Sequence, residues 1–352
     1  MKSPNALPAP ERILVIRLSA IGDVVMASPL IDALGRTWPE AKISWIVEDA
    51  SKPVLQANPG LDELIVWPRT RWRELFRDRR SWTLAKETLG FINDLRKRGF
   101  DMAIDAQGLL KSGLWAYLSG AQQRIGIGSK EGSRYLMTRV VERTGACARI
   151  SSQYLLLADS LRLDTRAFTM EVALTREAED HGIRFASSLP SPYVVLAPFT
   201  TRPQKHWIKE RWTSVVNLIT SELGLSVVLL GGPGDRQMSE KILPEERPDL
   251  VNLTGTTNLQ EAAAIIKNAS LVIGVDTGLT HMGYAFRVPT LALFGATRPY
   301  LDTAGAPGAV LYHPRECSPC RRSPTCEGDF TCMKAISVDE VVRTARSLME
   351  AP

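Results

Sequence analysis

Short apolar runs alternate with stretches of helical periodicity along most of the chain. In the first half the predicted strands are Arg12–Leu18, Lys42–Val47, Glu63–Trp67, Phe100–Ala106 and Gln123–Gly128, and the longer predicted helices are Trp82–Lys97 and Ser152–Leu163. In the second half the predicted strands are Tyr193–Ala197, Ser226–Leu230, Leu250–Thr254, Leu271–Val275 and Pro289–Phe294, and the predicted helices are Lys209–Leu223 and Leu259–Lys267. Strands that alternate with helices in this way predict an α/β protein with parallel sheets.

The length of the chain predicts two domains. A single hydrophobic core seldom grows beyond about 250–300 residues, and this chain has 352. The Ser- and Pro-rich segment 187–192 is typical of a linker, so the boundary is expected within residues 165–190. We therefore expect an N-terminal Rossmann-like domain of residues 1–175 and a C-terminal one of residues 176–352, facing each other across a cleft.

Positive charge is concentrated in the first half. Residues 1–150 hold 23 Lys and Arg against 16 Asp and Glu, whereas residues 151–352 hold 20 against 22. A basic half suits nucleic acid, anionic lipid or an acidic small substrate, and charge alone does not choose among them. No apolar run is long enough to span a membrane, and the N-terminus lacks the pattern of a signal peptide, so we expect a cytoplasmic protein.

The segment from Arg69 to Arg80 is the most basic in the chain. It holds six arginines in twelve positions, interleaved with Trp72, Leu75 and Phe76. A run of charge is usually a solvated helix face. The consistent use of arginine, which binds carboxylates and phosphates through two donors at once, favours an anion-binding or membrane-surface role instead.

Small and polar residues follow the predicted strands where ligands bind in open parallel sheets. The first such loop holds a single glycine, Gly22, which counts against a dinucleotide-binding enzyme. Asp23 follows it, and either caps the next helix or presents a carboxylate to a substrate hydroxyl; Ser28 before Pro29 is an alternative helix start. In the loop 231–235, Asp235 either caps a tight turn or binds ribose hydroxyls.

The stretch Leu271–Ala296 predicts one complete strand–loop–helix–strand unit. Asp276, Thr277, Gly278 and His281 would lie at the carboxyl end of its first strand, beside the N-terminus of a helix that favours an anionic ligand. The alternative is purely structural: Asp276 or Thr277 caps the helix, and His281 packs inside the domain.

Five motifs carry a resemblance to a known family. They are SAIGD (19–23), DAQGLLKS (105–112), TTRPQKHW (200–207), GVDTGLTH (274–281) and FGATRP (294–299). In this order and spacing, from about Ile13 to Phe294, the chain resembles the ADP-heptose lipopolysaccharide heptosyltransferases, glycosyltransferase family 9, which have the GT-B fold. Arg71-Trp72-Arg73 and Asp105–Gly108 look more like heptosyltransferase I than heptosyltransferase II.

The resemblance implies a role for each matched residue. Asp23 matches the family's general base, and Thr200, Thr201 and Lys205 match residues that hold the donor diphosphate. Asp276, Thr277, Gly278 and His281 match the nucleotide and phosphate loop, and Asp235 falls close to the ribose-binding acid. The basic positions near the acidic acceptor are Arg17, Arg71, Arg73 and Lys111.

The implied reaction moves heptose from ADP-heptose to Kdo of Kdo2-lipid A at the inner leaflet of the membrane, with inversion and without a cofactor. No Asp-x-Asp pair occurs in the chain, so we expect no metal clamp on the diphosphate. Transfer onto the first heptose, as by heptosyltransferase II, is the alternative within the family. A nucleic-acid-binding protein is the alternative from another class, although the sequence displays no nucleic-acid module.

Four cysteines near the C-terminus depart from the heptosyltransferase I pattern. Cys317, Cys320, Cys326 and Cys332 contain one C-x-x-C pair, but the five-residue spacings after it are not those of a standard zinc finger. We expect reduced thiols in a surface loop, with zinc or an iron–sulfur cluster as the alternative. Cys147 stands apart from them and is expected to be structural.

Overall fold

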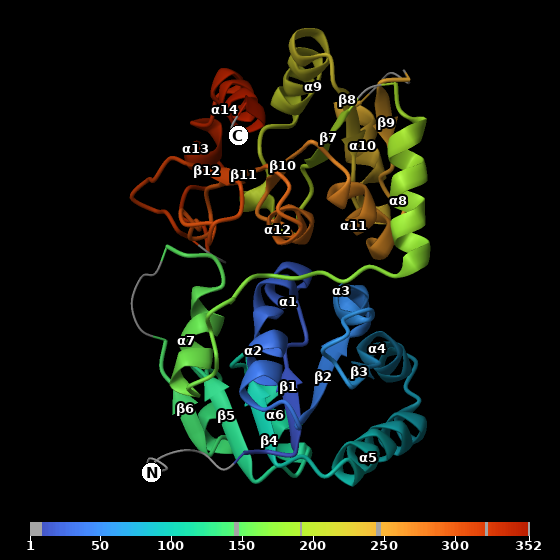
Figure 1. Ribbon diagram of the computed structural model, residues 1–352, viewed down its shortest axis with the longest axis vertical. Helices are drawn as coiled ribbons and strands as arrows, with labels where there is room; N and C mark the ends of the chain where they lie inside the picture. The colour runs from blue at the N-terminus through green and yellow to red at the C-terminus, as the bar shows by residue number, and fades with distance from the viewer. Residues whose placement is uncertain (1–8, 144–147, 191, 244–247, 321–322, 351–352) are drawn as a thin grey trace. The chain divides into compact units, whose positions relative to one another are not determined.

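The structure, a computed structural model, describes residues 9–143, 148–190, 192–243, 248–320 and 323–350. The chain forms two compact units, Met1–Cys147 with Ser151–Ala173 and Ala148–Ile150 with Leu174–Pro352 (Figure 1). Cys147 lies outside the described residues. Each unit is an α/β layer structure around its own parallel sheet, as the alternation of apolar runs and helical patterns predicted.

The sheet of the first unit has the strand order β3-β2-β1-β4-β5-β6, with every described neighbouring pair parallel. Its strands are β1 (Arg12–Ile16), β2 (Lys42–Glu48), β3 (Glu63–Trp67), β4 (Met102–Asp105), β5 (Gln123–Ile127) and β6 (Arg139–Val141). The order reverses between β1 and β4, and in open parallel sheets ligands bind at the carboxyl ends of the two strands that flank such a reversal.

Helices cover both faces of this sheet. They are α1 (Ile21–Ala27), α2 (Pro29–Thr37), α3 (Lys52–Leu55), α4 (Arg69–Arg77), α5 (Ser81–Lys97), α6 (Leu110–Leu118) and α7 (Ser152–Ser160), with short 3-10 turns at Asp49–Ser51 and Ser133–Leu136. The helix start at Ser28–Pro29 is confirmed, because α2 begins at Pro29, but Asp23 is not an N-cap: α1 begins at Ile21, and Asp23 is its third residue. Proline is tolerated at the first position of α2, where its missing N–H has no partner to lose.

The second unit repeats the same topology. Its strand order is β12-β11-β10-β7-β8-β9, again parallel between described neighbours. The strands are β7 (Tyr193–Ala197), β8 (Ser226–Leu229), β9 (Leu250–Asn252), β10 (Leu271–Val275), β11 (Thr290–Phe294) and β12 (Gly308–Tyr312). The reversal lies between β7 and β10, so the loops after these two strands are where a ligand is expected.

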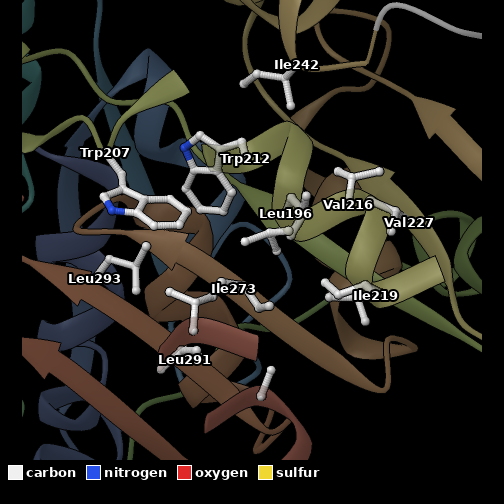
Figure 2. Close-up of a cluster of buried hydrophobic side chains, with 14 of the residues drawn as sticks. Leu196, Trp207, Trp212, Val216, Ile219, Val227, Ile242, Ile273, Leu291 and Leu293 are labelled. Atoms are coloured by element: carbon white, nitrogen blue, oxygen red, sulfur yellow. The ribbon is translucent and has the colours of Figure 1, made fainter. Parts of the chain in front are cut away.

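A large hydrophobic core anchors the loops of the second unit. The helices are α8 (Arg176–Ser188), α9 (Lys209–Leu223), α10 (Arg236–Ile242), α11 (Leu259–Lys267), α12 (Gly278–Ala285), α13 (Thr331–Lys334) and α14 (Val338–Glu350), with 3-10 turns at Pro203–Lys205 and Pro233–Asp235. Figure 2 shows side chains of α9, α10 and the central strands meeting in this core, with Trp207 edge-on to Trp212 at 5.0 Å between ring centroids. The indole Nε1 of Trp207 donates to the carbonyl of Ile336 at 3.1 Å, which fixes the segment after β7 to the C-terminal part of the unit.

The sequence pattern did not predict β6, which pairs with β5, because three residues with an exposed Arg139 are too few to show a strand pattern. The division after Ala173 falls within the expected range of residues 165–190, although segment 187–192, read as the linker, follows α8 inside the second unit. No helix within the described ranges carries an apolar stretch of the length that a bilayer requires.

Candidate active site

Asp23 lies at the carboxyl end of β1, in the first turn of α1. Its Oδ2 accepts the backbone N–H of Ala20 at 3.3 Å and forms an ion pair with Arg17. The side chain is 35% exposed, so the carboxylate is held by the protein and still reaches solvent. Asp23 therefore stabilises the helix start from within the first turn and presents an accessible carboxylate.

Arg17 supports Asp23 from inside the unit. The Arg17 side chain is buried, and its guanidinium carbon lies 5.9 Å from the centre of the Tyr154 ring. The Arg17 carbonyl accepts the indole N–H of Trp45 at 3.2 Å. The buried Arg17 guanidinium is thus held between Tyr154 and the carboxylate of Asp23, the candidate base.

The DAQG motif, residues 105–108, begins at the last residue of β4 and contacts the segment that follows β1. Asp105 is fully buried, and its Oδ1 accepts the backbone N–H groups of Gln107 at 3.0 Å and Gly108 at 2.9 Å. Gln107 Oε1 in turn accepts the N–H of Leu18, which follows β1. Burial raises the pKa of Asp105 above its ordinary value, although the hydrogen bonds from Gly108 and Gln107 oppose that rise. The motif thus joins the ends of β1 and β4.

Glu48 forms ion pairs with two positively charged side chains at the same edge of the sheet. This carboxylate ends β2 and is buried; Oε1 accepts from Lys111 Nζ at 2.9 Å, and Oε2 accepts from Arg69 at 2.9 Å. The hydroxyl of Ser19, four residues before Asp23, donates to Oε1 at 3.3 Å. Sequence reasoning missed Glu48 and Arg69. An acidic residue directly after the apolar run Trp45–Val47 was the available signal.

Arg71 and Arg73 are not brought into this cluster. Arg71 forms a bidentate ion pair with Glu87 of α5, at 2.6 Å for its shortest contact, and Arg73 is exposed. Two residues along a helix turn the side chain by about 200°, so Arg71 points away from the direction of Arg69. Among the described residues, the basic side chains that form ion pairs with Asp23 or Glu48 are therefore Arg17, Arg69 and Lys111.

The second unit holds a separate charged cluster around Asp276, which directly follows β10. Lys205 Nζ contacts Asp276 Oδ2 at 2.5 Å, the Thr297 hydroxyl donates to the same oxygen at 2.6 Å, and His281 Nε2 lies 3.2 Å from Oδ1. Burial alone would raise the pKa of Asp276, but the hydrogen bond with His281 and the charge of Lys205 outweigh it and lower the pKa. Both carboxylate oxygens thus have protein partners.

The helix after Asp276 starts as the sequence predicted. Thr277 is the residue before α12, and Gly278 is its first residue. Thr280 donates its hydroxyl to the carbonyl of Val275 at 2.7 Å, which ties the first turn of α12 to the end of β10. His281 is buried, as the structural alternative expected, and also contacts Asp276. Free N–H groups of the first turn lie beside the Lys205–Asp276 pair.

The remaining expected donor residues lie in loops of the same unit. Thr200 and Thr201 follow β7, and the Thr200 carbonyl lies 2.8 Å from His206 Nε2. Asp235 ends a 3-10 turn, and its Oδ2 accepts the N–H of Gly232 at 2.9 Å. This contact is the capping role considered for Asp235. Its ribose-binding role stays a prediction.

Cys317, Cys320, Cys326 and Cys332 are free thiols in the structure. Nowhere in the described residues do three His, Cys, Asp or Glu side chains lie together as metal ligands would. Cys317, Cys320 and Cys326 are half-buried free thiols, but Cys332 belongs to the hydrophobic core of the second unit. The expectation of four thiols in a surface loop is therefore wrong for Cys332, because α13 packs its apolar side against the sheet.

Relatives of the chain are heptosyltransferases. It is 26% identical over 303 residues to lipopolysaccharide heptosyltransferase 1 of Salmonella typhimurium, covering 82% of this chain and 90% of the relative. It is 28% identical over 326 residues to lipopolysaccharide heptosyltransferase 1 of Pseudomonas aeruginosa, covering 90% of this chain and 87% of the relative. Relatives named as heptosyltransferases 2 match at 26–28% identity.

The fold is also similar to that of a solved heptosyltransferase structure. The structure of Escherichia coli heptosyltransferase WaaC with ADP superimposes with a TM-score of 0.74, at 22% identity, over 96% of this chain and 99% of that one. At this identity the likeness shows the fold, which is GT-B with two Rossmann-like domains. The family model of glycosyltransferase family 9 (heptosyltransferase) matches residues 88–330, more than half of the chain. The chain therefore belongs to glycosyltransferase family 9, the heptosyltransferases, and is a glycosyltransferase.

Proposed function

We propose that this enzyme transfers heptose from ADP-heptose to Kdo of the lipopolysaccharide inner core, with Kdo2-lipid A as acceptor. The observation that carries the proposal is Asp23, an accessible carboxylate that Arg17 and the Ala20 N–H hold at the carboxyl end of β1. The relatives named lipopolysaccharide heptosyltransferase 1 support the choice of donor and acceptor.

The proposed reaction is a single displacement. An acceptor hydroxyl attacks the anomeric carbon of heptose as its proton passes to the Asp23 carboxylate. The bond from that carbon to the diphosphate oxygen breaks, and ADP leaves with the electron pair, so the anomeric centre inverts. The leaving diphosphate gains charge, which a fixed cation and free N–H groups stabilise.

Lys205 and the start of α12 supply that stabilisation in the proposal. The ammonium group has three donors, and Asp276 takes two of them, through Oδ2 at 2.5 Å and through its carbonyl oxygen at 3.4 Å. In the proposal the third reaches the diphosphate, together with N–H groups of the first turn after Gly278. Thr200, Thr201, Thr277 and Asp235 complete the proposed donor site on the strength of the family motifs.

Basic side chains of the first unit form the proposed acceptor side. Lys111 and Arg69 contact Glu48 beside Ser19 and Asp23, and an acceptor rich in carboxylates and phosphates would meet them there. Arg71 and Arg73 lie further along the same basic helix. We propose that the acceptor is reached at the cytoplasmic face of the inner membrane, and that the reaction needs no metal ion.

Transfer onto the first heptose is the second candidate. Relatives named heptosyltransferase 2 match this chain about as well as those named heptosyltransferase 1, at 26–28% identity. The nucleic-acid alternative and a dehydrogenase are set aside, because the chain belongs to a glycosyltransferase family.

Comparison of two acceptors tests the proposal. Purified enzyme is incubated with ADP-heptose and either Kdo2-lipid A or the same acceptor already carrying one heptose, and ADP release is measured with and without EDTA. We expect release with Kdo2-lipid A alone and no loss with EDTA. Release only with the heptosylated acceptor would establish the second candidate, and a requirement for added magnesium or manganese would contradict the metal-free mechanism.

Substitution of the base is the companion test. Asp23→Asn is expected to abolish transfer while ADP binding, measured by calorimetry, stays within about threefold of wild type, a difference of under about 0.7 kcal/mol. The matched control is Asp32→Asn, since Asp32 also forms an ion pair on a helix of the first unit, with Arg36, but away from β1. Loss of both transfer and ADP binding in Asp23→Asn would show a structural role.

A further inference from the structure

Among the described residues, large exposed apolar side chains are more numerous in the first unit than in the second. Of the large apolar residues that are exposed among those described, seven fall between residues 76 and 135: Phe76, Trp82, Leu89, Leu110, Leu114, Tyr117 and Tyr135. The other three, Ile183, Met238 and Leu301, are scattered over the second unit. Single exposed apolar residues are normal on a soluble surface, but a group of them marks an interaction site.

The end of α4 and the start of α5 each carry a strongly exposed aromatic side chain. Phe76 is 77% exposed and Trp82 is 83% exposed, and every residue between them is exposed as well. We call residues 76–82 the α4–α5 apex. Figure 1 shows these two helices beside β3, at one edge of the sheet of the first unit.

The apolar residues of the apex are not the core-facing side of their helices. That side is already occupied: Trp72 of α4 and Phe91 of α5 pack edge-on at 5.7 Å, and both contact Trp115 of α6. Leu75, next to Phe76, is buried. The hydrophobic core of the unit therefore has its own contacts from α4 and α5 without Phe76 and Trp82.

Positive charge lies between the two aromatic residues. Arg77, Arg79 and Arg80 are exposed, and the single acidic residue of the apex, Asp78, contacts Arg77 at 3.2 Å. Arg79 and Arg80 thus leave the apex with a net positive charge. Exposed aromatic rings beside arginines are typical of segments that lie at a membrane surface, where the rings enter the headgroup region and the guanidinium groups bind lipid phosphates.

The same helix joins the apex to the candidate acceptor side. Arg69, the first residue of α4, contacts Glu48 in the cluster beside Ser19, and α4 runs from there to Arg77. At 1.5 Å per residue, Phe76 lies about 10 Å along the helix from Arg69. A surface that binds lipid at the apex would thus bring the headgroup region within one short helix of the acceptor-side basic residues.

We propose that the α4–α5 apex is the membrane-binding surface of this enzyme and that its partner is an anionic lipid bilayer. Phe76 and Trp82 enter the boundary between headgroups and acyl chains, and Arg79 and Arg80 bind lipid phosphates. The purpose of this surface, access to a lipid-linked acceptor, rests on the proposed function. The binding itself needs no acceptor and is measured without one.

Vesicle flotation tests the surface directly. The full-length enzyme is mixed with vesicles of phosphatidylcholine alone or of phosphatidylcholine with phosphatidylglycerol, both lacking lipopolysaccharide, at low and high salt. We expect binding to the anionic vesicles only, and release at high salt because the charges are exposed. The double variant Arg79→Gln/Arg80→Gln is expected to bind about 30-fold more weakly, and Phe76→Ser/Trp82→Ser at least about tenfold more weakly.

Matched controls come from the second unit. Ile183→Ser/Leu301→Ser removes two other exposed apolar side chains, and Arg184→Gln/Arg343→Gln removes two other exposed arginines. Both controls are expected to float with anionic vesicles as wild type does. All substituted side chains are exposed, so every variant is expected to keep the wild-type melting temperature.

Three results would contradict the proposal that the α4–α5 apex binds the membrane. Apex variants that bind anionic vesicles as tightly as wild type would exclude the apex as the anchor. Apex variants that lose transfer to a deacylated, water-soluble acceptor would show that these residues act through the acceptor site or the fold. A wild-type dimer that becomes a monomer in Phe76→Ser/Trp82→Ser, by light scattering, would identify a second copy of the chain as the partner. Vesicle binding without any transferase activity would instead leave the surface in place and contradict the proposed function.

Discussion

Replacement of Lys205 by Met probes the donor side most directly. The Lys205 side chain is 16% exposed and its ammonium group contacts the Asp276 carboxylate, which is 12% exposed. A hydrogen bond to a charged group contributes about 1.5–3 kcal/mol. If Lys205 donates to the donor diphosphate, Lys205→Met should therefore raise the dissociation constant for ADP by about 10- to 150-fold.

The same substitution should lower the stability of the second unit. It leaves Asp276 charged and largely buried, although Thr297 and His281 still contact the carboxylate. Breaking a buried ion pair by removing one partner costs about 3–5 kcal/mol, and the two remaining contacts place this case near the lower figure. The double variant Lys205→Met/Asp276→Asn removes both charges and should recover most of that loss, while ADP binding stays weak.

The pH dependence of stability has a definite sign. The folded protein holds the pKa of Asp276 below its ordinary value, so the unfolded chain takes up a proton first as the pH falls. The stabilisation from Asp276 is therefore complete above about pH 4 and is lost as the pH falls further. Lys205→Met removes one of the charges that lower this pKa, so the folded-state pKa moves towards that of the unfolded chain and the variant should lose less stability on acidification than wild type.

Calorimetric titration with ADP, and urea unfolding between about pH 3 and about pH 7, measure these effects on the two variants and on wild type. Unchanged ADP affinity in Lys205→Met would refute the diphosphate role of Lys205. Strong ADP binding by the double variant would refute it equally. A stable Lys205→Met with no change in its pH profile would show that the Lys205–Asp276 pair contributes nothing to the fold.

Three further predictions concern the first unit. Trp72→Ala should lower the free energy of unfolding by about 3–5 kcal/mol, and Phe76→Ala, four residues on but 77% exposed, by no more than about 0.5 kcal/mol; equal effects in urea unfolding would contradict the burial difference. Burial raises the pKa of Asp105, so the folded protein binds the Asp105 proton more tightly than the unfolded chain does. The free energy of unfolding therefore falls as the pH rises above about 4, the pKa of Asp in an unfolded chain. Asp105→Asn should make the free energy of unfolding less dependent on pH in that range, and an unchanged dependence in urea titrations would count against this account. Gly108→Ala should prevent stable folding, because φ is +71° and a Cβ would lie 2.0 Å from a backbone oxygen; Gly132→Ala, with φ +82° in open space, should lower the unfolding free energy by only about 1–2 kcal/mol, and similar melting temperatures would contradict the clash.

Most strands of both sheets could be predicted from the sequence because they are buried. Strands covered on both faces consist of continuous apolar residues, and Leu271–Val275 and Tyr193–Ala197 are buried throughout. The helices at Lys209–Leu223 and Leu259–Lys267 agree with their expected bounds for the same reason, since a regular apolar face packs on each sheet. The segment after Phe294 has no continuous apolar run of this kind. Its strand β12 is only half-buried, so it was not predicted.

Which charged residues meet could not be read from the sequence. Glu48 and Lys111 are 63 residues apart, and Asp276 and Lys205 are 71 apart. Ion pairs over such separations depend on which strands are neighbours in the sheet and on the loop geometry at their ends. Arg69 and Arg71 illustrate the limit, because both belong to one arginine-rich helix and only the rotation of that helix decides which of them reaches Glu48.

The motif residues of the second unit stabilise one another before any ligand is bound. Asp276 of GVDTGLTH contacts Lys205 of TTRPQKHW and Thr297 of FGATRP, so one carboxylate joins three motifs that are distant in the sequence. The Lys205 side chain is only 16% exposed, and its contact with the Asp276 carboxylate holds it in place. Under the proposed function Asp276 would contribute to diphosphate binding by positioning Lys205, because its own oxygens already have protein partners. That role would account for an acidic residue in a phosphate-binding motif, where a carboxylate on its own would repel the ligand.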